Sequence, residues 1–280
     1  MWDAAQYLRF GGERARPFFD LVAQVGATSP GYVADLGCGP GHLTAALAQR
    51  WPDATVVGVD NSPEMIAAAQ AAVSAPGHGT GPLHTGPLRT GPPSAPHLSF
   101  SLGDVWSWRP ARPLDVLTCN AVLQWVPDHD ELLLRWADLL APGGWLAFQL
   151  PGNFDQATHV ILRELAKSPR WRGQLGDVQL NRQAGDPGHY LALLARAGYA
   201  VDAWETSYLH ILHGDNPVLD WTRGTALRPV LAALDADQAE GFLAEYGKRL
   251  HEAYRPQPFG TVFPFRRVFT VVHRTDPSRT

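Results

Sequence analysis

The sequence predicts an α/β fold in which a doubly wound, mostly parallel sheet of seven strands carries a helical cap. Between residues 31 and 150, short runs rich in β-branched residues alternate with longer helical patterns, which is typical of a parallel sheet. After Pro151 the helical patterns become longer, and only two further strand-like runs follow. We therefore expect one sheet with helices on both faces and a group of later helices beside it.

The first half of the chain is predicted to supply five strands and the helices between them. The strands are Tyr32–Leu36, Thr55–Asp60, Leu98–Leu102, Leu114–Cys119 and Trp145–Leu150. The helices are Leu43–Arg50, Pro63–Ala72 and Asp128–Leu140. Ser62 suits the N-cap of the second helix, because Pro63 then takes the first helical position. Pro142, Gly143 and Gly144 are expected to end the third helix.

The second half is predicted to contain the last two strands and four helices. The strands are Tyr199–Tyr208 and Arg266–His273, and the last strand is expected to return to the main sheet. The helices lie near Gln156–Lys167, Gly188–Ala197, Val218–Leu231 and Asp237–Tyr254, with a polar stretch before Gly185. Helices around 153–185 and 215–256 should form a cap over the ligand edge of the sheet. This divides the chain into an N-terminal flap or helix (1–30), a core (31–150) and a C-terminal part (151–280).

Residues 74–97 form an insertion built from Gly, Pro, Ser, Thr and His. Such a composition buries too little apolar surface to offset the entropy lost on ordering, so we expect a flexible surface loop. Its histidines, His78, His84 and His97, are expected to be solvated rather than to bind metal.

Composition restricts the function classes. A net charge of −4 gives no positive field to attract nucleic acid or an anionic membrane. Cys38 and Cys119 have no paired spacing, and the chain has no HExxH-type motif, so we expect neither a disulfide framework nor a metal. The charged N-terminal segment is unlike a signal peptide, and no apolar run approaches the ~20 residues that cross a bilayer. We expect a cytoplasmic protein without metal, membrane or nucleic-acid partners.

A glycine-rich loop, Asp35-Leu36-Gly37-Cys38-Gly39-Pro40-Gly41, falls where the first strand turns into the first helix. Glycines there allow backbone angles closed to other residues and let a ligand approach the main chain. Asp60 ends the second strand and is placed to accept hydrogen bonds from a ribose. Together these features predict a nucleoside cofactor at the carboxyl ends of the strands.

The loop favours S-adenosylmethionine over a dinucleotide. In the dinucleotide fingerprint the third glycine lies three positions after the second, but here that position is His42 and the glycine comes one residue early, at Gly41. Asp35 would also lie unfavourably beside a pyrophosphate and favourably beside an ammonium group. S-adenosylmethionine carries an ammonium and a sulfonium and has no phosphate.

These motifs resemble those of class I methyltransferases, which have a Rossmann-like fold. The resemblance implies that Asp104 and Val105 hold the adenine and that the segment Asn120-Ala121 lines the methionine portion. The cofactor-binding residues expected from the loop and from this resemblance are Asp35, Gly37, Cys38, Gly39, Gly41, Asp60, Asn61, Asp104, Val105 and Asn120.

Further motifs resemble the trans-aconitate 2-methyltransferase family over nearly the whole chain. They are Trp2-Asp3, Tyr7–Phe10, Arg14–Pro17, Leu123–His129, Gln149–Phe154, Val201–Thr206, Leu227–Pro229 and Phe265–Arg267. The insertion 74–97 and the stretch Arg170–Gly185 depart from the family, but neither falls on a motif. The resemblance implies methyl transfer to one carboxylate of trans-aconitate, giving a monomethyl ester.

A carboxylate acceptor needs binding groups rather than a general base, because its pKa near ~4 leaves it ionised at neutral pH. Arginine binds the remaining carboxylates of a tricarboxylate well, since its planar fork is bidentate and stays charged. The residues expected to contact the acceptor are Arg228, Arg267, Tyr208, His210, Trp125, Trp221, Tyr7 and Arg14.

Three other hypotheses stay open at this stage. The acceptor could be a phenol, an amine or another metabolite, in which case His210 or His129 would matter as a base. A nucleotide-dependent oxidoreductase is disfavoured by the displaced third glycine. A non-catalytic module that only binds S-adenosylmethionine would share the cofactor motifs.

Overall fold

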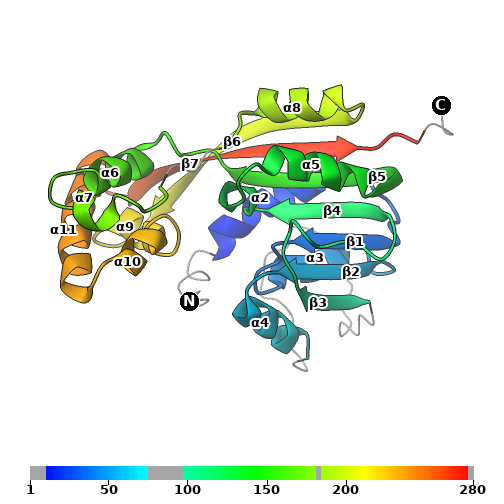
Figure 1. Ribbon diagram of the computed structural model, residues 1–280, viewed down its shortest axis with the longest axis horizontal. Helices are drawn as coiled ribbons and strands as arrows, with labels where there is room; N and C mark the ends of the chain where they lie inside the picture. Colours follow the sequence, from blue (N-terminus) through cyan, green and yellow to red (C-terminus); the bar gives the residue numbers. More distant parts are fainter. Residues whose placement is uncertain (1–10, 75–96, 181–183, 277–280) are drawn as a thin grey trace.

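The computed structural model describes residues 11–74, 97–180 and 184–276 (Figure 1). Its seven strands form one sheet in the order β3-β2-β1-β4-β5-β7-β6. The strands are β1 (Tyr32–Leu36), β2 (Thr55–Asp60), β3 (Leu98–Leu102), β4 (Leu114–Asn120), β5 (Leu140–Pro151), β6 (Ala200–Leu212) and β7 (Thr261–His273). Neighbours from β3 to β5 pair in parallel, and β7 is antiparallel to both β5 and β6. The predicted fold class is confirmed.

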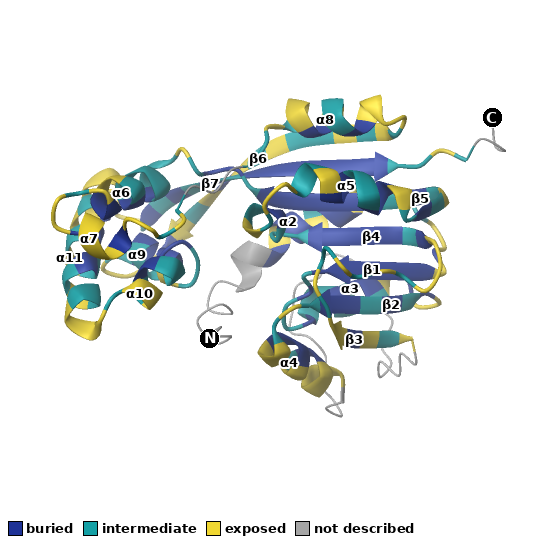
Figure 2. Cartoon of the chain, viewed as in Figure 1, coloured by how far each residue is buried: buried dark blue, intermediate teal, exposed yellow. Residues whose placement is uncertain are grey.

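The two faces of the sheet are covered by different helices. The helices α2 (Gly11–Ala23) and α3 (His42–Arg50) pack on the face that carries Val33, Val56 and Val116, and α4 (Pro63–Ser74) packs near the β3 edge. The opposite face, which carries Ala34, Leu117 and Phe148, is covered by α5 (His129–Asp138) and α8 (Pro187–Arg196). Strand residues therefore alternate between two cores, and the central strands are buried throughout (Figure 2).

The remaining helices form a cap with its own hydrophobic core. They are α6 (Ala157–Ala166), α7 (Arg172–Leu175), α9 (Pro217–Arg223), α10 (Arg228–Ala233) and α11 (Ala236–Ala253). This cap core contains Trp221, Phe242, Tyr246 and Phe263, and it includes the start of β7. Because β7 begins in the cap and runs antiparallel to β5, the parallel strands run toward the cap, which lies at the left in Figure 1. The cap therefore faces the carboxyl ends of the parallel strands.

Three strands are several residues longer than predicted, and one predicted helix is correspondingly shorter. The third predicted helix ends at Asp138 rather than Leu140, and the Pro-Gly-Gly turn residues lie within β5. There Leu140 pairs with Leu114 before a register shift, and Gly143 takes a positive φ of 79°. The strands expected at Tyr199–Tyr208 and Arg266–His273 continue to the pair Leu212–Thr261, so this antiparallel pair reaches into the cap.

One predicted helix and the predicted polar stretch also need correction. The single helix expected at Val218–Leu231 is interrupted between Gly224 and Leu227, so that α9 and α10 are separate. Pro229 lies near the start of α10, where a missing backbone N–H costs no intrahelical bond. The stretch predicted to be polar up to Gly185 contains α7, and Trp171 beside that helix is buried in the cap core.

Within the described residues, no helix is both long enough and apolar enough to cross a membrane. In the same ranges no group of three His, Cys, Asp or Glu side chains is placed to hold a metal ion. Cys38 and Cys119 are buried and unpaired. Residues 1–10 of the predicted flap, and nearly all of the predicted insertion at 74–97, lie outside the described residues.

Candidate cofactor and acceptor site

The glycine loop connects β1 to α3 and uses its glycines in two ways. Gly37, Gly39 and Gly41 all have positive φ, at 75°, 54° and 81°. A Cβ at Gly37 would lie 2.1 Å from Val122 Cγ2, and one at Gly41 would lie 2.6 Å from Phe100. A Cβ at Gly39 would meet nothing within 4 Å. The first and third glycines therefore serve packing, whereas Gly39 leaves open space beside the main chain.

Asp60 fixes this loop from the neighbouring strand. One carboxylate oxygen accepts a hydrogen bond from the backbone N–H of Gly39 at 2.9 Å, and the other accepts one from Ser62 N–H at 2.9 Å. Each carboxylate oxygen has a further lone pair for a ligand. The aspartate thus orders the loop and stays able to accept hydrogen bonds.

Asp35 is a buried carboxyl, with 2% of its surface exposed. It accepts hydrogen bonds from the hydroxyls of Thr44 at 2.6 Å and Thr118 at 2.9 Å. Burial raises its pKa from 3.8 to about 6, the two hydroxyls act in the opposite direction, and the charge of Asp60 adds to the increase. A cation near Asp35 would favour its ionised form.

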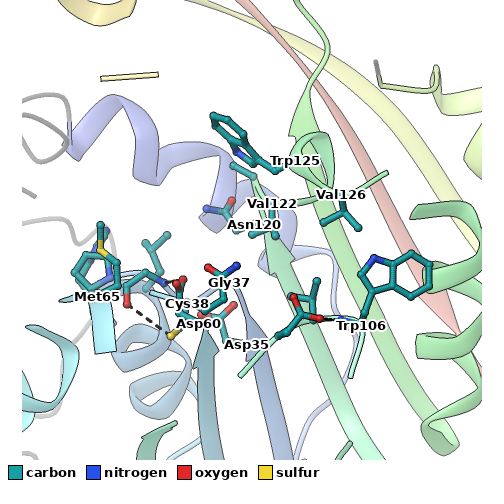
Figure 3. Close-up of a pocket in the computed structure, with 18 of the residues that line it drawn as sticks. Asp35, Gly37, Cys38, Asp60, Met65, Trp106, Asn120, Val122, Trp125 and Val126 are labelled. Atoms are coloured by element: carbon teal, nitrogen blue, oxygen red, sulfur yellow. Dashed lines mark hydrogen bonds between the residues drawn. The ribbon is translucent and has the colours of Figure 1, made fainter. Parts of the chain in front are cut away.

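These elements surround a cavity of about 440 Å³, which we call the first cavity. All the predicted cofactor-binding residues except Gly41 line it; they are Asp35, Gly37, Cys38, Gly39, Asp60, Asn61, Asp104, Val105 and Asn120. Gly41 lies behind the loop against Phe100. Figure 3 shows residues of β1, β2 and β4 gathered around this space. The volume is within the ~300–1,000 Å³ that small-molecule sites occupy.

A smaller cavity of about 100 Å³, the second cavity, lies between the sheet and the cap. Ala121 and Trp125 line both cavities, so the two adjoin at the end of β4. Ala121 has a φ of 58°, which is unfavourable for a residue with a Cβ, and strained residues of this kind cluster at functional sites. Its backbone N–H donates to Gln149 O at 2.9 Å, which holds it there.

A chain of hydrogen bonds connects the two cavities through β5. Arg267, on β7, lines the second cavity and donates to Gln149 Oε1 at 3.1 Å. Gln149 Nε2 in turn donates to Asn120 Oδ1, and Asn120 lines the first cavity. Gln149 and Arg267 are 0% and 6% exposed, so this chain lies in a low-dielectric environment where such bonds are strong.

The charges of the two cavities differ. The first is lined by three aspartates, Asp35, Asp60 and Asp104, together with Arg228. The second, in the described part of the chain, is lined by Arg267 and by no aspartate or glutamate. The first cavity therefore suits a ligand with positive groups, and the second suits an anion.

Comparison with known proteins agrees with this geometry. Residues 9–204 match a family profile described as a methyltransferase domain. A trans-aconitate 2-methyltransferase of Streptomyces avermitilis is 50% identical over 276 residues, covering 98% of this chain and 97% of that protein. The enzyme of that name from Rhodococcus jostii is 47% identical, covering 97% of this chain and 98% of that protein. The one from Mycobacterium tuberculosis is 42% identical, covering 97% of this chain and 96% of that protein.

The chain belongs to the trans-aconitate 2-methyltransferase family. Its fold is also that of a putative methyltransferase of Bacillus halodurans (TM-score 0.56, 15% identity, covering 93% of this chain and 99% of that one). A phosphoethanolamine N-methyltransferase of Haemonchus contortus, solved with S-adenosyl-L-methionine, gives a TM-score of 0.53 at 15% identity, covering 92% and 52%. The cofactor of this methyltransferase family is S-adenosylmethionine, and the open, acidic first cavity fits its size and its positive groups.

The residues expected to contact the acceptor are distributed between the two cavities. Arg228 lines the first cavity, Arg267 and Trp221 line the second, and Trp125 lines both. Tyr7 and the side chain of Arg14 lie outside the described residues.

Two other expected contacts line neither cavity. Tyr208 donates a hydrogen bond to Asp20 at 2.7 Å and so joins β6 to α2. His210 stacks on Trp221, with ring centroids 5.1 Å apart, and stands behind the wall of the second cavity rather than in it.

Several lining residues were not expected from the sequence as site residues. His42 was noted only as the residue in place of a glycine, yet it lines the first cavity, and burial lowers the pKa of its imidazole. Asn153 lines the second cavity, and Gln149 connects the two cavities. Both of these belong to the motif Gln149–Phe154, which is the signal that could have identified them.

Proposed function

We propose that this methyltransferase transfers a methyl group from S-adenosylmethionine to one carboxylate of trans-aconitate. The observation that carries the proposal is the pair of adjoining cavities with opposite charge, which share Ala121 and Trp125. A cationic cofactor in the acidic cavity and an anionic acceptor beside the arginines would meet at this boundary. The names of the relatives supply the identity of the acid.

At the cofactor end, the roles follow from the polar groups that line the first cavity. Asp60 would accept hydrogen bonds from the ribose hydroxyls while it holds Gly39 N–H. Asp35 and Asn120 would face the methionine portion, and Asp104 and Val105 would flank the adenine. When bound, S-adenosylmethionine supplies an activated methyl group on a sulfonium.

At the acceptor end, the protein has to orient an anion that is already reactive. A carboxylic acid with a pKa near ~4 is ionised at neutral pH, so no side chain has to remove a proton. Arg228 and Arg267 would hold the carboxylates, and Trp125 would limit the access of water at the boundary. Alignment of this kind can contribute ~7–11 kcal/mol at its best, and it is the main task left to the protein.

We also propose that the reaction takes place in the cytoplasm. The support is the pair of buried, unpaired cysteines, Cys38 and Cys119, which fits a reducing compartment.

The test is methyl transfer from labelled S-adenosylmethionine to a panel of acceptors. The panel contains trans-aconitate, cis-aconitate, citrate and isocitrate beside phenols and amines. We expect saturable labelling of trans-aconitate, with a KM about 10–100-fold higher in Arg228→Ala, because a charge-assisted contact of ~1.5–3 kcal/mol is lost. If the acids stay unlabelled while the cofactor binds, the acceptor assignment is wrong and only the cofactor assignment survives.

A further inference from the structure

We propose that the second cavity is a subsite for a carboxylate arm of the acceptor that does not react, and that Asn153 recognises this arm. The proposal rests on the proposed function and goes further, because it assigns the two ends of the acceptor to different places. The reacting carboxylate would lie at the boundary with the first cavity, and the second arm would lie under the cap.

The size and walls of the second cavity fit a small, flat group. Its volume of about 100 Å³ is several times the ~10–15 Å³ that one water needs. Its walls include the aromatic rings of Trp125, Trp221, Phe154 and Phe265. Trp221 and Phe265 are 2% and 8% exposed and are packed in the cap core, so they form a fixed surface. Aromatic faces of this kind pack well against a planar unsaturated acid.

The charge of the second cavity selects an anion. The Arg267 guanidinium lies 4.8 Å from the centre of the Phe265 ring and donates to the neutral amide of Gln149. In the described part of the chain, Arg267 lines this cavity and no aspartate or glutamate does. A carboxylate in this partly enclosed space would interact with the guanidinium with little screening by water.

Asn153 indicates a bound ligand independently of the shape and charge of the second cavity. Its side chain lines the second cavity, the residue is 2% exposed, and its Oδ1 is buried without a hydrogen-bond partner in the described structure. An unpaired buried polar atom is costly and is uncommon in folded proteins. Rotation of the amide exchanges its oxygen and nitrogen, so Asn153 can present an N–H donor to a carboxylate.

Main-chain hydrogen bonds fix the position of Asn153 beside the second cavity. The residue follows the end of β5, and the preceding residue, Gly152, donates its N–H to Arg266 O at 2.9 Å. The carbonyl of Asn153 accepts from Gln156 N–H at 3.1 Å, at the start of α6. Main-chain contacts therefore anchor Asn153 to both the sheet and the cap, while its side-chain Oδ1 has no partner among the described residues.

The test compares acids that differ by one carboxylate. Binding of trans-aconitate, mesaconate and itaconate to protein saturated with S-adenosylhomocysteine is measured by calorimetry for the wild type and for Asn153→Asp and Asn153→Ala. Mesaconate replaces the carboxymethyl arm by a methyl group, and itaconate lacks only the carboxylate on the CH carbon of the double bond. We expect Asn153→Asp to weaken trans-aconitate about 30-fold or more and Asn153→Ala to weaken it less, because only aspartate adds repulsion.

For one of the two truncated acids, the loss of affinity caused by Asn153→Asp should fall below about threefold. That acid has no carboxylate in the subsite, so the new charge has nothing there to repel. Gln174→Glu places the same charge on the exposed surface of the cap and should leave all three affinities unchanged. Cofactor affinity and melting temperature report whether the variants are folded. Equal penalties for the three acids would overturn the subsite but leave the proposed function standing, whereas a wild-type protein that neither binds nor methylates any acid would reject the proposed function itself.

Discussion

Arg267 donates a hydrogen bond to Oε1 of Gln149, and this bond determines how a third residue presents its amide. Arginine has only donors, so Gln149 must turn its oxygen toward Arg267 and its Nε2 toward Asn120. Asn120 therefore accepts through Oδ1, which leaves its Nδ2 as the atom available to the first cavity. A charged residue of the second cavity thus fixes a hydrogen-bond donor in the first.

We expect Gln149→Glu to impair acceptor binding. A glutamate there would pair with Arg267 and cancel its charge, and it would force Asn120 to donate to it and to turn Oδ1 into the first cavity. The KM for the acid should rise about 10–100-fold, in line with the loss of a ~1.5–3 kcal/mol contact to a charged group. Steady-state kinetics at saturating cofactor measures this effect.

The matched control is Gln149→Met, which keeps the length of the side chain and removes both hydrogen bonds but leaves the charge of Arg267. It should raise KM less than Gln149→Glu does. Equal effects of the two variants would mean that Gln149 acts through packing alone.

Asp35 should make the stability of the protein depend on pH. Its folded pKa of about 6 lies above its ordinary value of 3.8, so the folded state binds this proton more tightly than the unfolded state does. The stabilising contribution is full below about pH 4 and is lost as the pH rises through about 6. Asp35→Asn, which cannot ionise, should therefore gain stability relative to the wild type between pH 4 and 6, by about 3 kcal/mol at most. Chemical denaturation at several pH values measures this difference.

The same carboxyl should make cofactor affinity depend on pH. A cationic ligand favours ionised Asp35, so the affinity for S-adenosylmethionine should fall as the pH drops through about 6 in the wild type. Calorimetric titrations of Asp35→Asn should show weaker binding with a flatter pH profile. If the affinity of Asp35→Asn for S-adenosylmethionine depended on pH as that of the wild type does, Asp35 would not contact the cofactor.

Gly39 and Gly37 should respond differently to the same substitution. The methyl group of Gly39→Ala has open space, so we expect this variant to fold. Its free energy of unfolding should fall only by the ~1–2 kcal/mol that the left-handed conformation costs an alanine. That methyl group would occupy space in the first cavity, and the affinity for S-adenosylmethionine should fall at least about tenfold, or ~1.4 kcal/mol. Gly37→Ala would drive its Cβ against Val122, so its melting temperature should fall much further. Cofactor affinity in Gly39→Ala equal to that of the wild type would place the ligand elsewhere.

His210 should not act as a general base. It stacks on Trp221 and lines neither cavity, and a carboxylate acceptor has no proton to give up. We expect kcat/KM of His210→Gln to stay within about threefold of the wild type, whereas loss of a general base costs about 10²–10⁴-fold. The pH–rate profile of this variant is the measurement. Disappearance of its acidic limb would favour a phenol or amine acceptor and a catalytic His210.

The sequence by itself determined the cofactor half of the site. The strands Tyr32–Leu36 and Thr55–Asp60 and the glycine loop have the predicted bounds, because short buried strands and a tight turn are specified by neighbouring residues. Asp60 could be placed beside Gly39 because adjacent parallel strands end at the same edge of the sheet. Local patterns and one rule of topology were sufficient there.

Only the tertiary structure decided the acceptor half. The hydrogen bond between Gln149 and Arg267 joins residues 118 positions apart, through the antiparallel pairing of β5 with β7. The antiparallel pairing of β7 with β6 continues beyond the end of β5 into the cap, and this extension brings Phe265 against Trp221 at the wall that Asn153 completes. Such contacts depend on strand register and on packing between segments far apart in the sequence. A local sequence pattern does not determine which distant residues come into contact.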